Sequence, residues 1–184
     1  MKIYTKRGDA GNTSLIGEKV LPKSHLRIEA IGSVDELNAH IGVIRDQAVN
    51  NKRQELLHPI QENLFVIGSL LAATGDKKPE FLPDFDEQGV GQLEEEIDAM
   101  EQALEPMRFF ILPGGHPDVS ACHVARCVCR RSERAVVRLH ESEGVKAELI
   151  VYLNRLSDFL FVLARTIGQE QEVQEIPWKP REKK

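Results

Sequence analysis

The chain has 184 residues, a length that suits one compact domain, and its 41% apolar and 29% charged residues are typical of a soluble globular protein. The net charge of -5 argues against a general nucleic-acid binder, which is usually basic overall. No apolar run approaches the roughly 18 residues of a membrane span, and the first residues lack a signal-peptide core, so we expect a cytoplasmic protein without a membrane segment.

The first distinctive feature along the chain is a polar, glycine-rich stretch, TKRGDAGNT, at residues 5–13. Gly8 and Gly11 permit backbone conformations in which successive N–H groups point at one anion. Lys6 and Arg7 would add full positive charges. The stretch matches neither the Walker pattern nor a dinucleotide fingerprint, and an ordinary flexible N-terminus with turns is the alternative. We predict a loop that holds a phosphate.

Five segments carry apolar residues at three- and four-residue steps, the period of one helix face. They are residues 27–47, 55–74, 90–104, 119–142 and 146–168. Pro59 marks either the start of regular helix in the second segment or a kink there. Because the connections are short and no strand alternation competes, the pattern predicts an all-α, up-and-down bundle of four to five helices, one domain spanning residues 1–184.

Three other segments are expected to be irregular. Residues 76–87 read as one long loop, and residues 109–115 (FFILPGG) as a buried connector. The polar tail, residues 170–184, is expected to be mobile, although Trp178 could dock on a surface. Cys122, Cys127 and Cys129 have the spacing of neither a zinc site nor a disulfide framework, which favours buried or partly buried thiols.

The fourth predicted helix carries a charged stripe. Arg126, Arg130 and Glu133 fall within about 60° of one another on the helix surface. The opposite side holds apolar residues: Val124, Val128, Ala135 and Leu139. Arg131 and Arg134 enlarge the guanidinium cluster, which could bind phosphate through paired hydrogen bonds. The alternative is a solvated face with Glu–Arg pairs along the helix.

Two other predicted helices carry polar stripes beside their apolar faces. Asp35 and Asn38 share one on the first helix, and Asn154, Asp158 and Arg165 share one on the last. Polar stripes at the edges of apolar helices indicate a charged seam within or between bundles.

Four stretches of the chain together resemble the PduO-type ATP:corrinoid adenosyltransferases, the cob(I)alamin adenosyltransferases. They are TKRGDAGNTSLIG (5–17), RIEAIGSVDELN (27–38), FILPGG (110–115) with ARCVCRRSER (125–134), and YLNRLSDFLFVLAR (152–165). The resemblance implies transfer of the 5'-deoxyadenosyl group of ATP to the cobalt of reduced cob(I)alamin or a related corrinoid, with release of triphosphate. It also implies a homotrimer in which the N-terminal loop of one subunit, residues 1–25, and the arginine-rich helix of its neighbour hold ATP.

The resemblance also implies which residues form the site. Those expected to bind ATP are Thr5, Lys6, Arg7, Gly8, Asp9, Gly11, Thr13, Ser14, Lys23, Arg130, Arg131, Glu133, Arg134 and Asn154. Asp35 and Arg126 match an intersubunit salt bridge near the corrinoid, and Phe110 matches the aromatic residue that excludes the lower axial ligand of cobalamin. With Arg130, these three form the expected catalytic set. By itself, a phenylalanine in the run FFIL would be read as core.

The resemblance further implies Mg²⁺ on the ATP phosphates, without side-chain ligands. A cobalt reductase and an adenosylcobalamin-dependent enzyme are expected as partners. Two rival functions stay open: a nucleotide sensor that uses the same pocket without catalysis, and a ferritin-like metal bundle. The latter needs Glu-x-x-His motifs on facing helices, and the six histidines do not supply such a facing pair.

Overall fold

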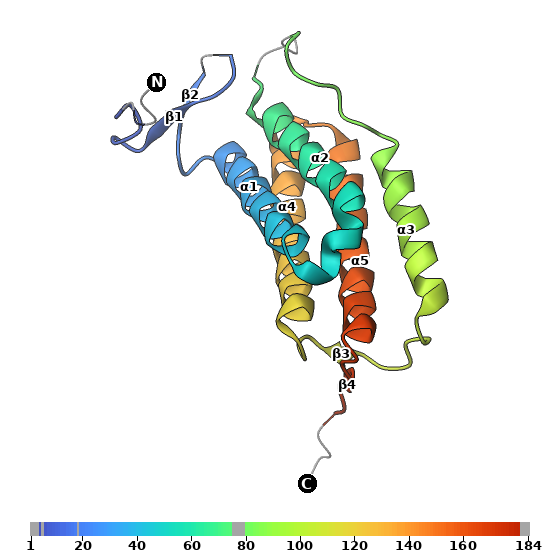
Figure 1. Ribbon diagram of the computed structural model, residues 1–184. Coiled ribbons are helices and arrows are strands. Elements are labelled where there is room, and N and C mark those ends of the chain that lie inside the picture. Colours follow the sequence, from blue (N-terminus) through green and yellow to red (C-terminus); the bar gives the residue numbers. More distant parts are fainter. Residues whose placement is uncertain (1–3, 5, 18, 75–79, 181–184) are drawn as a thin grey trace.

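Five α-helices and a short 3-10 helix make up most of the computed structural model, which describes residues 4, 6–17, 19–74 and 80–180. The helices are α1 (Leu26–Arg45), α2 (Gln54–Ala72), α3 (Gly89–Ala103), α4 (Pro117–Glu143) and α5 (Ala147–Glu170), and the 3-10 helix η1 (Ala48–Arg53) leads into α2. Figure 1 shows α1, α2, α4 and α5 side by side as a bundle, with α3 along the outside of α5. None of the described helices is both long and apolar enough to span a membrane.

The core lies where α1, α2, α4 and α5 face one another. Its members are fully buried aliphatic side chains at helical spacing, among them Leu37, Ile41, Leu57, Leu64, Val136, Leu139, Leu153 and Leu160. Tyr152 of α5 packs edge-on against Phe85, with ring centroids 5.6 Å apart. The outer helix α3 buries only Gly89 and Leu93.

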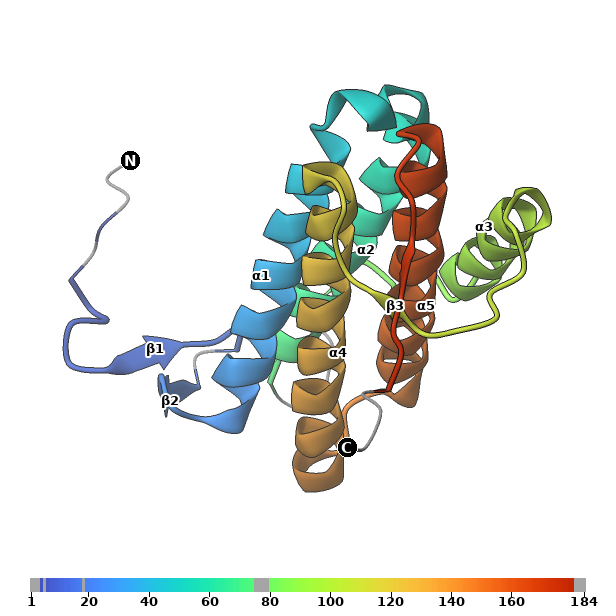
Figure 2. The ribbon, with the colours of Figure 1, turned by 90° about the horizontal axis from the view of Figure 1, so that it is seen from below.

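A small antiparallel hairpin precedes the bundle. Strand β1 (Asn12–Ser14) pairs with β2 (Val20–Pro22), and Ile16 forms a bridge to Ala73 at the end of α2. Gly17 has φ 102°, and a Cβ there would lie 2.7 Å from the Thr74 carbonyl oxygen, so only glycine fits this approach. Figure 1 and Figure 2 place the hairpin beyond α1, at the edge of the molecule opposite α3.

Arg27, near the start of α1, joins the ends of three helices. Its buried guanidinium donates to the Leu71 carbonyl at 2.7 Å and to the Glu143 carboxylate at 2.6 Å. Burial alone would raise the pKa of Glu143, but the hydrogen bonds and charge of Arg27 outweigh it and lower that pKa below 4.5. The start of α1 and the ends of α2 and α4 are thus joined just after the hairpin.

A second two-stranded ribbon lies at the other end of the bundle. Strand β3 (Ile111–Leu112) pairs antiparallel with β4 (Ile176–Pro177). The sequence predicted neither ribbon, because strands of two or three residues are too short to show an alternating pattern. Residues 176–178 of the predicted mobile tail therefore have partners, while 181–184 lie outside the described residues.

The predicted helices are confirmed to within a few residues at each end. One helix start and one connecting segment differ from the prediction. Regular helix in α2 begins at Gln54, five residues before Pro59, and continues through it. The predicted buried connector is wrong: Phe109 and Phe110 are largely exposed, because the β3–β4 ribbon holds this segment on the surface.

Candidate functional site

The N-terminal loop and hairpin enclose a hollow of about 650 Å³. Its lining comes only from this part of the chain: Arg7, Gly8, Asn12, Thr13, Ser14, Val20 and Lys23. The Lys23 ammonium lies against the backbone of Gly8, where a Cβ would be 3.2 Å from Nζ. Two cations and two hydroxyls facing one hollow suit a phosphate chain. Thr5, also predicted here, lies outside the described residues.

The backbone of the loop is bent back on itself. Lys6 has φ 63°, a conformation that is uncommon outside glycine, and Gly11 has φ 80°. The Asp9 N–H donates to the Lys6 carbonyl at 3.3 Å, and the Lys23 N–H to the Gly11 carbonyl at 2.8 Å. The second bond brings Lys23 beside the glycine-rich turn, 12 residues later in the sequence.

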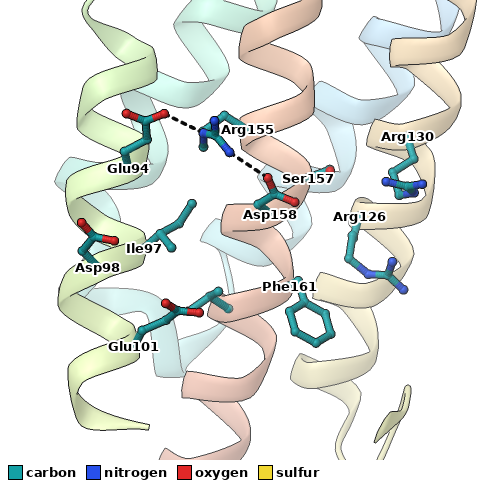
Figure 3. A pocket seen from close by; sticks show the side chains of 11 residues that line it. Glu94, Ile97, Asp98, Glu101, Arg126, Arg130, Arg155, Ser157, Asp158 and Phe161 are labelled. Carbon is teal, nitrogen blue, oxygen red and sulfur yellow. Dashed lines mark hydrogen bonds and ion pairs between the residues drawn. The ribbon is translucent and has the colours of Figure 1, made fainter. Parts of the chain in front are cut away.

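A second hollow, of about 580 Å³, lies between α3, α4 and α5. Figure 3 shows Arg126 and Arg130 reaching toward it from α4, opposite Arg155 and Asp158 of α5. Arg155 is paired with Glu94 at 2.8 Å and with Asp158 at 3.0 Å. Neither Arg126 nor Arg130 forms an ion pair among the described residues, so both charges are available to a ligand or a neighbouring chain.

Arg126 is nevertheless held in place. Its guanidinium carbon lies 5.9 Å from the centroid of the Phe161 ring, a cation–π contact. Its Nε atom is buried and has no hydrogen-bond partner among the described residues. His123 lies on the same ring at 6.0 Å, and its pKa is lowered by burial and then by the charge of Arg126. The Nη2 of Arg126 donates to the Cys127 sulfur at 3.7 Å, so the ring of Phe161 and this thiol hold a guanidinium whose Nε has no partner among the described residues.

Arg131 and Arg134 lie on another face of α4. They line a hollow of about 560 Å³ with His123, Val124, Cys127 and Val128, together with Pro113 and Ser120. Arg131 forms an ion pair with Glu36 of α1, and Arg134 donates to the Arg130 carbonyl at 2.8 Å. The predicted guanidinium cluster is thus split between two faces of the helix.

The apolar side assigned to this helix from the sequence is also partly wrong. Val124 is exposed, whereas Cys122, Cys129 and Val136 are fully buried, so the core face lies about 90° from the arginine stripe rather than opposite it.

The remaining predicted polar residues fall in three places. Asn154 donates to the Glu133 carboxylate at 3.0 Å, so these two predicted ATP ligands are neighbours. Asp35 and Asn38 line a hollow of about 250 Å³ between α1 and α2, with the exposed ring of Phe65. Arg165 is buried at the far end of α5 and pairs with Glu175, and it lines none of the four hollows.

Phe110 lies on the segment between α3 and α4 with 77% of its surface exposed. The interpretation of this residue as ordinary core is therefore wrong for the single chain. An exposed aromatic ring at a fixed position is an apolar surface for a ligand or a subunit.

Several residues that line the hollow between α3, α4 and α5 were not predicted from the sequence, Phe161 and Arg155 among them. Phe161 lies three residues after Asp158 and one turn before Arg165, on the stripe already assigned to the last helix. The helical spacing was therefore enough to find it. Arg155 lies off that stripe, and only its pairing with Glu94 of α3 places it at the hollow.

The structure also bears on metal binding and on the thiols. Among the described residues, no three acidic, histidine or cysteine side chains come together as a metal site; Glu55 and His58 have Glu-x-x-His spacing but lie exposed on α2. Cys122 and Cys129 are buried and Cys127 is exposed. Burial, with a smaller contribution from the charge of Asp118, raises the pKa of Cys122 to about 12.

Known proteins are similar to this chain in sequence and in fold. A family model described as cobalamin adenosyltransferase matches residues 3–167. A cobalamin adenosyltransferase of Cupriavidus metallidurans is 40% identical over an alignment 183 positions long, which covers 97% of this chain and 94% of the relative. A corrinoid adenosyltransferase of Bacillus subtilis is 38% identical over an alignment 184 positions long, which covers 97% of this chain and 93% of the relative.

A solved structure is similar over almost the whole chain. It is a phenylalanine-to-alanine variant of a PduO-type ATP:corrinoid adenosyltransferase from Lactobacillus reuteri, complexed with cobalamin and ATP. The TM-score is 0.91 at 36% sequence identity, and the match covers 97% of this chain and 100% of that chain. Both its sequence and its fold show that the chain belongs to the cobalamin adenosyltransferase family.

Proposed function

We propose that this chain transfers the 5'-deoxyadenosyl group of ATP to the cobalt of reduced cob(I)alamin or a related corrinoid, which forms adenosylcobalamin and releases triphosphate. The observation that carries the proposal is the end-to-end match to an adenosyltransferase structure complexed with cobalamin and ATP. The cationic hollows of this chain supply the charge that a triphosphate requires.

ATP is proposed to bind between two subunits of a homotrimer. The hairpin hollow and the hollow between α3, α4 and α5 share no lining residue in the described chain, and the hairpin lies at the α1 edge, opposite α3 (Figure 2). One subunit therefore presents a phosphate loop at one edge and free arginines toward the other. A cyclic head-to-tail assembly would bring the two together.

Within that shared site, each group has a proposed role. Lys6, Arg7 and Lys23 would bind the phosphates from one side, and the arginines of α4 from the neighbouring subunit. Glu133 and Asn154, already hydrogen-bonded to each other, would hold the nucleoside end of ATP in place. The other loop residues assigned to ATP are Thr5, Gly8, Asp9, Gly11, Thr13 and Ser14.

The corrinoid is proposed to lie near Asp35, Arg126 and Phe110. Asp35 and Arg126 line different hollows of one chain, so a salt bridge between them would join two subunits. Phe110, with its exposed ring, would occupy the lower face of the corrinoid and exclude an axial ligand. Cobalt(II) without that ligand is easier to reduce, which brings cobalt(I) within reach of a cellular reductase.

The proposed reaction is a nucleophilic substitution at the 5' carbon of ATP. Cobalt(I) donates an electron pair to the 5' carbon of the ribose, a cobalt–carbon bond forms, and the bond from that carbon to the triphosphate oxygen breaks. Because the cobalt is the nucleophile, the protein needs no general base. Negative charge grows on the leaving triphosphate, and preorganised cations such as Lys23 and Arg130 stabilise it more in the transition state than in bound ATP.

Mg²⁺ is proposed to accompany ATP. Because the described residues hold no cluster of metal-ligating side chains, the ion would be held by phosphate oxygens, where it would neutralise part of their charge. We further propose a cytoplasmic location, with a cobalt reductase and an adenosylcobalamin-dependent enzyme as partners.

An anaerobic assay with ATP and chemically reduced cobalamin tests the function. Adenosylcobalamin and triphosphate are expected in equal amounts, followed by the cobalt spectrum and by chromatography. A nucleotide sensor would bind ATP but release no triphosphate under the same conditions, and that result would overturn the proposal.

A further inference from the structure

The segment that carries Phe110 buries little of its own apolar surface against the bundle. It runs from Leu104 to His116 between α3 and α4, and most of its large apolar side chains, Met107, Phe109, Phe110 and Leu112, are exposed. Exposed side chains contribute little burial energy, so the position of Phe110 must be set by other contacts. Figure 1 shows that the C-terminal strand β4 lies against this segment below α5.

Buried Arg165 of α5 joins the C-terminal tail to the start of this segment. Its Nε donates to the Glu175 carboxylate at 2.7 Å, and its Nη2 donates to the Glu105 carbonyl at 2.8 Å. One guanidinium therefore holds both the tail and the chain that leads to Phe110. Hydrogen bonds between a guanidinium and a carboxylate are among the stronger ones in proteins.

Two further contacts hold the tail along the segment. The Trp178 N–H donates to the carbonyl oxygen of Phe110 itself, at 2.7 Å. At the other end, Gly115 lies so close to Val173 that a Cβ would come within 2.4 Å of its Cγ1. Residues 105–115 are thus fixed to the tail at both ends and in the middle.

The register of the ribbon sets the direction of the Phe110 ring. Because Leu112 lies opposite Ile176 and Ile111 opposite Pro177, Phe110 lies opposite Trp178. Side chains alternate along a strand, and directly opposite residues share a face. Phe110, Leu112, Ile176 and Trp178 therefore share one face, and their exposed fractions are 77%, 48%, 56% and 51%.

We propose that Arg165 and Glu175 are positioning residues for Phe110: they anchor the C-terminal strand, which holds the backbone of Phe110 and directs its ring outward. The proposal rests on the proposed function, because it assigns Phe110 to the corrinoid. A purely structural ion pair would contribute stability alone, whereas a positioning pair also controls the coordination of the cobalt.

The first test replaces Glu175, the exposed member of the pair, because substitution of buried Arg165 would endanger folding. Glu175→Ala is compared with Gln174→Ala, which alters an exposed neighbour in the same tail. The parent and variants are mixed with ATP and cob(II)alamin, and the four-coordinate cobalt(II) signal is measured by electron paramagnetic resonance. We expect Glu175→Ala to lower that signal about tenfold, because one charge-assisted anchor is lost, with a lower Tm and with KM for ATP close to the parent.

A second pair of variants isolates the backbone contact. Trp178→Ala removes the ring but keeps the N–H, whereas Trp178→Pro removes both, and proline is compatible with an extended strand edge. The four-coordinate signal is expected to be several-fold lower in Trp178→Pro than in Trp178→Ala.

The outcomes separate this inference from the proposed function. If the parent forms adenosylcobalamin but Glu175→Ala and Trp178→Pro give the same cobalt signal as their controls, the positioning role is overturned. If Glu175→Ala lowers Tm and leaves the cobalt signal unchanged, the pair is structural only. If the parent itself neither forms adenosylcobalamin nor gives the four-coordinate signal, the proposed function fails first.

Discussion

Asp35 and Arg126 belong to separate hollows of the same chain. Asp35 lies between α1 and α2, and Arg126 lies between α3, α4 and α5 with its guanidinium over Phe161. Within the described part of the chain, no ion pair joins them. A salt bridge between the two residues, as proposed above, would therefore require two subunits.

A charge exchange tests that pairing. Asp35→Arg and Arg126→Asp alone would each place like charges together at the interface, and we expect either to weaken assembly and lower turnover at least tenfold. The double variant restores opposite charges and is expected to recover much of the assembly, measured by analytical ultracentrifugation. No recovery in the double variant would contradict a direct pair.

Arg130 is the cation best placed to act on the triphosphate, because it lines the hollow between α3, α4 and α5 and forms no ion pair within the described residues. Arg130→Ala is expected to lower kcat about 100-fold, as is typical when one preorganised donor is removed from a growing negative charge. Arg138→Ala, an exposed arginine two turns later on the same helix, is the matched control. Near-parental kcat and KM for ATP in Arg130→Ala would contradict the assignment.

The three cysteines are expected to differ in reactivity. Cys127 is exposed, whereas Cys122 and Cys129 are buried, and burial raises the pKa of both buried thiols. Since the thiolate is the reactive form, a neutral alkylating reagent should modify one cysteine in the native protein and three after unfolding. Mass spectrometry counts the added groups, and Cys127→Ser should abolish the native reaction. Rapid native modification of Cys122 or Cys129 would show that the core around α4 opens.

The ion pair between Arg27 and Glu143 predicts a pH effect on stability. Because the pKa of Glu143 is lowered in the folded state, its contribution is fully present above the unfolded value of 4.5 and is lost as the pH falls through the folded value. Glu143→Gln should lower the free energy of unfolding at pH 7 by about 2 kcal/mol and flatten its decline below pH 4.5. Chemical denaturation at several pH values measures this.

Glu141→Gln, an exposed neighbour on α4, is the control for that experiment. If Glu143→Gln and Glu141→Gln gave the same pH profile, Glu143 would not anchor Arg27.

The helices of this fold were predictable because each carries a long apolar period, and α1 and α5 begin and end within a few residues of their predicted bounds. The two ribbons were not predictable. Each depends on a partner distant in sequence, such as Ile111 with Pro177, and a strand of two residues leaves no pattern. The exposure of Phe110 was missed for the same reason, since the run FFIL resembles a core segment until its partner strand is known.

The site was only partly predictable from the sequence. Residues 5–13 are neighbours in the chain, so their composition alone predicted a phosphate site, whereas Lys23 was assigned to it only through the family resemblance. On α4, helical spacing grouped Arg126 with Arg130, and the structure keeps them together. Spacing could not show that Arg131 is drawn away by Glu36 of α1, because that depends on how the helices pack. Spacing also did not predict that Arg165 hydrogen-bonds Glu175 of the C-terminal tail.

Subunit complementation tests the shared site most directly. Lys23→Ala alters only the loop and Arg130→Ala only α4, and each variant alone should be nearly inactive. When the two are unfolded, mixed in equal amounts and refolded, random assembly of a cyclic trimer would rebuild about one quarter of the sites from an intact loop and an intact helix. Recovery of about that fraction of adenosyltransferase activity is the predicted result. A mixture that refolds into trimers but stays as inactive as its components would contradict a site shared between subunits.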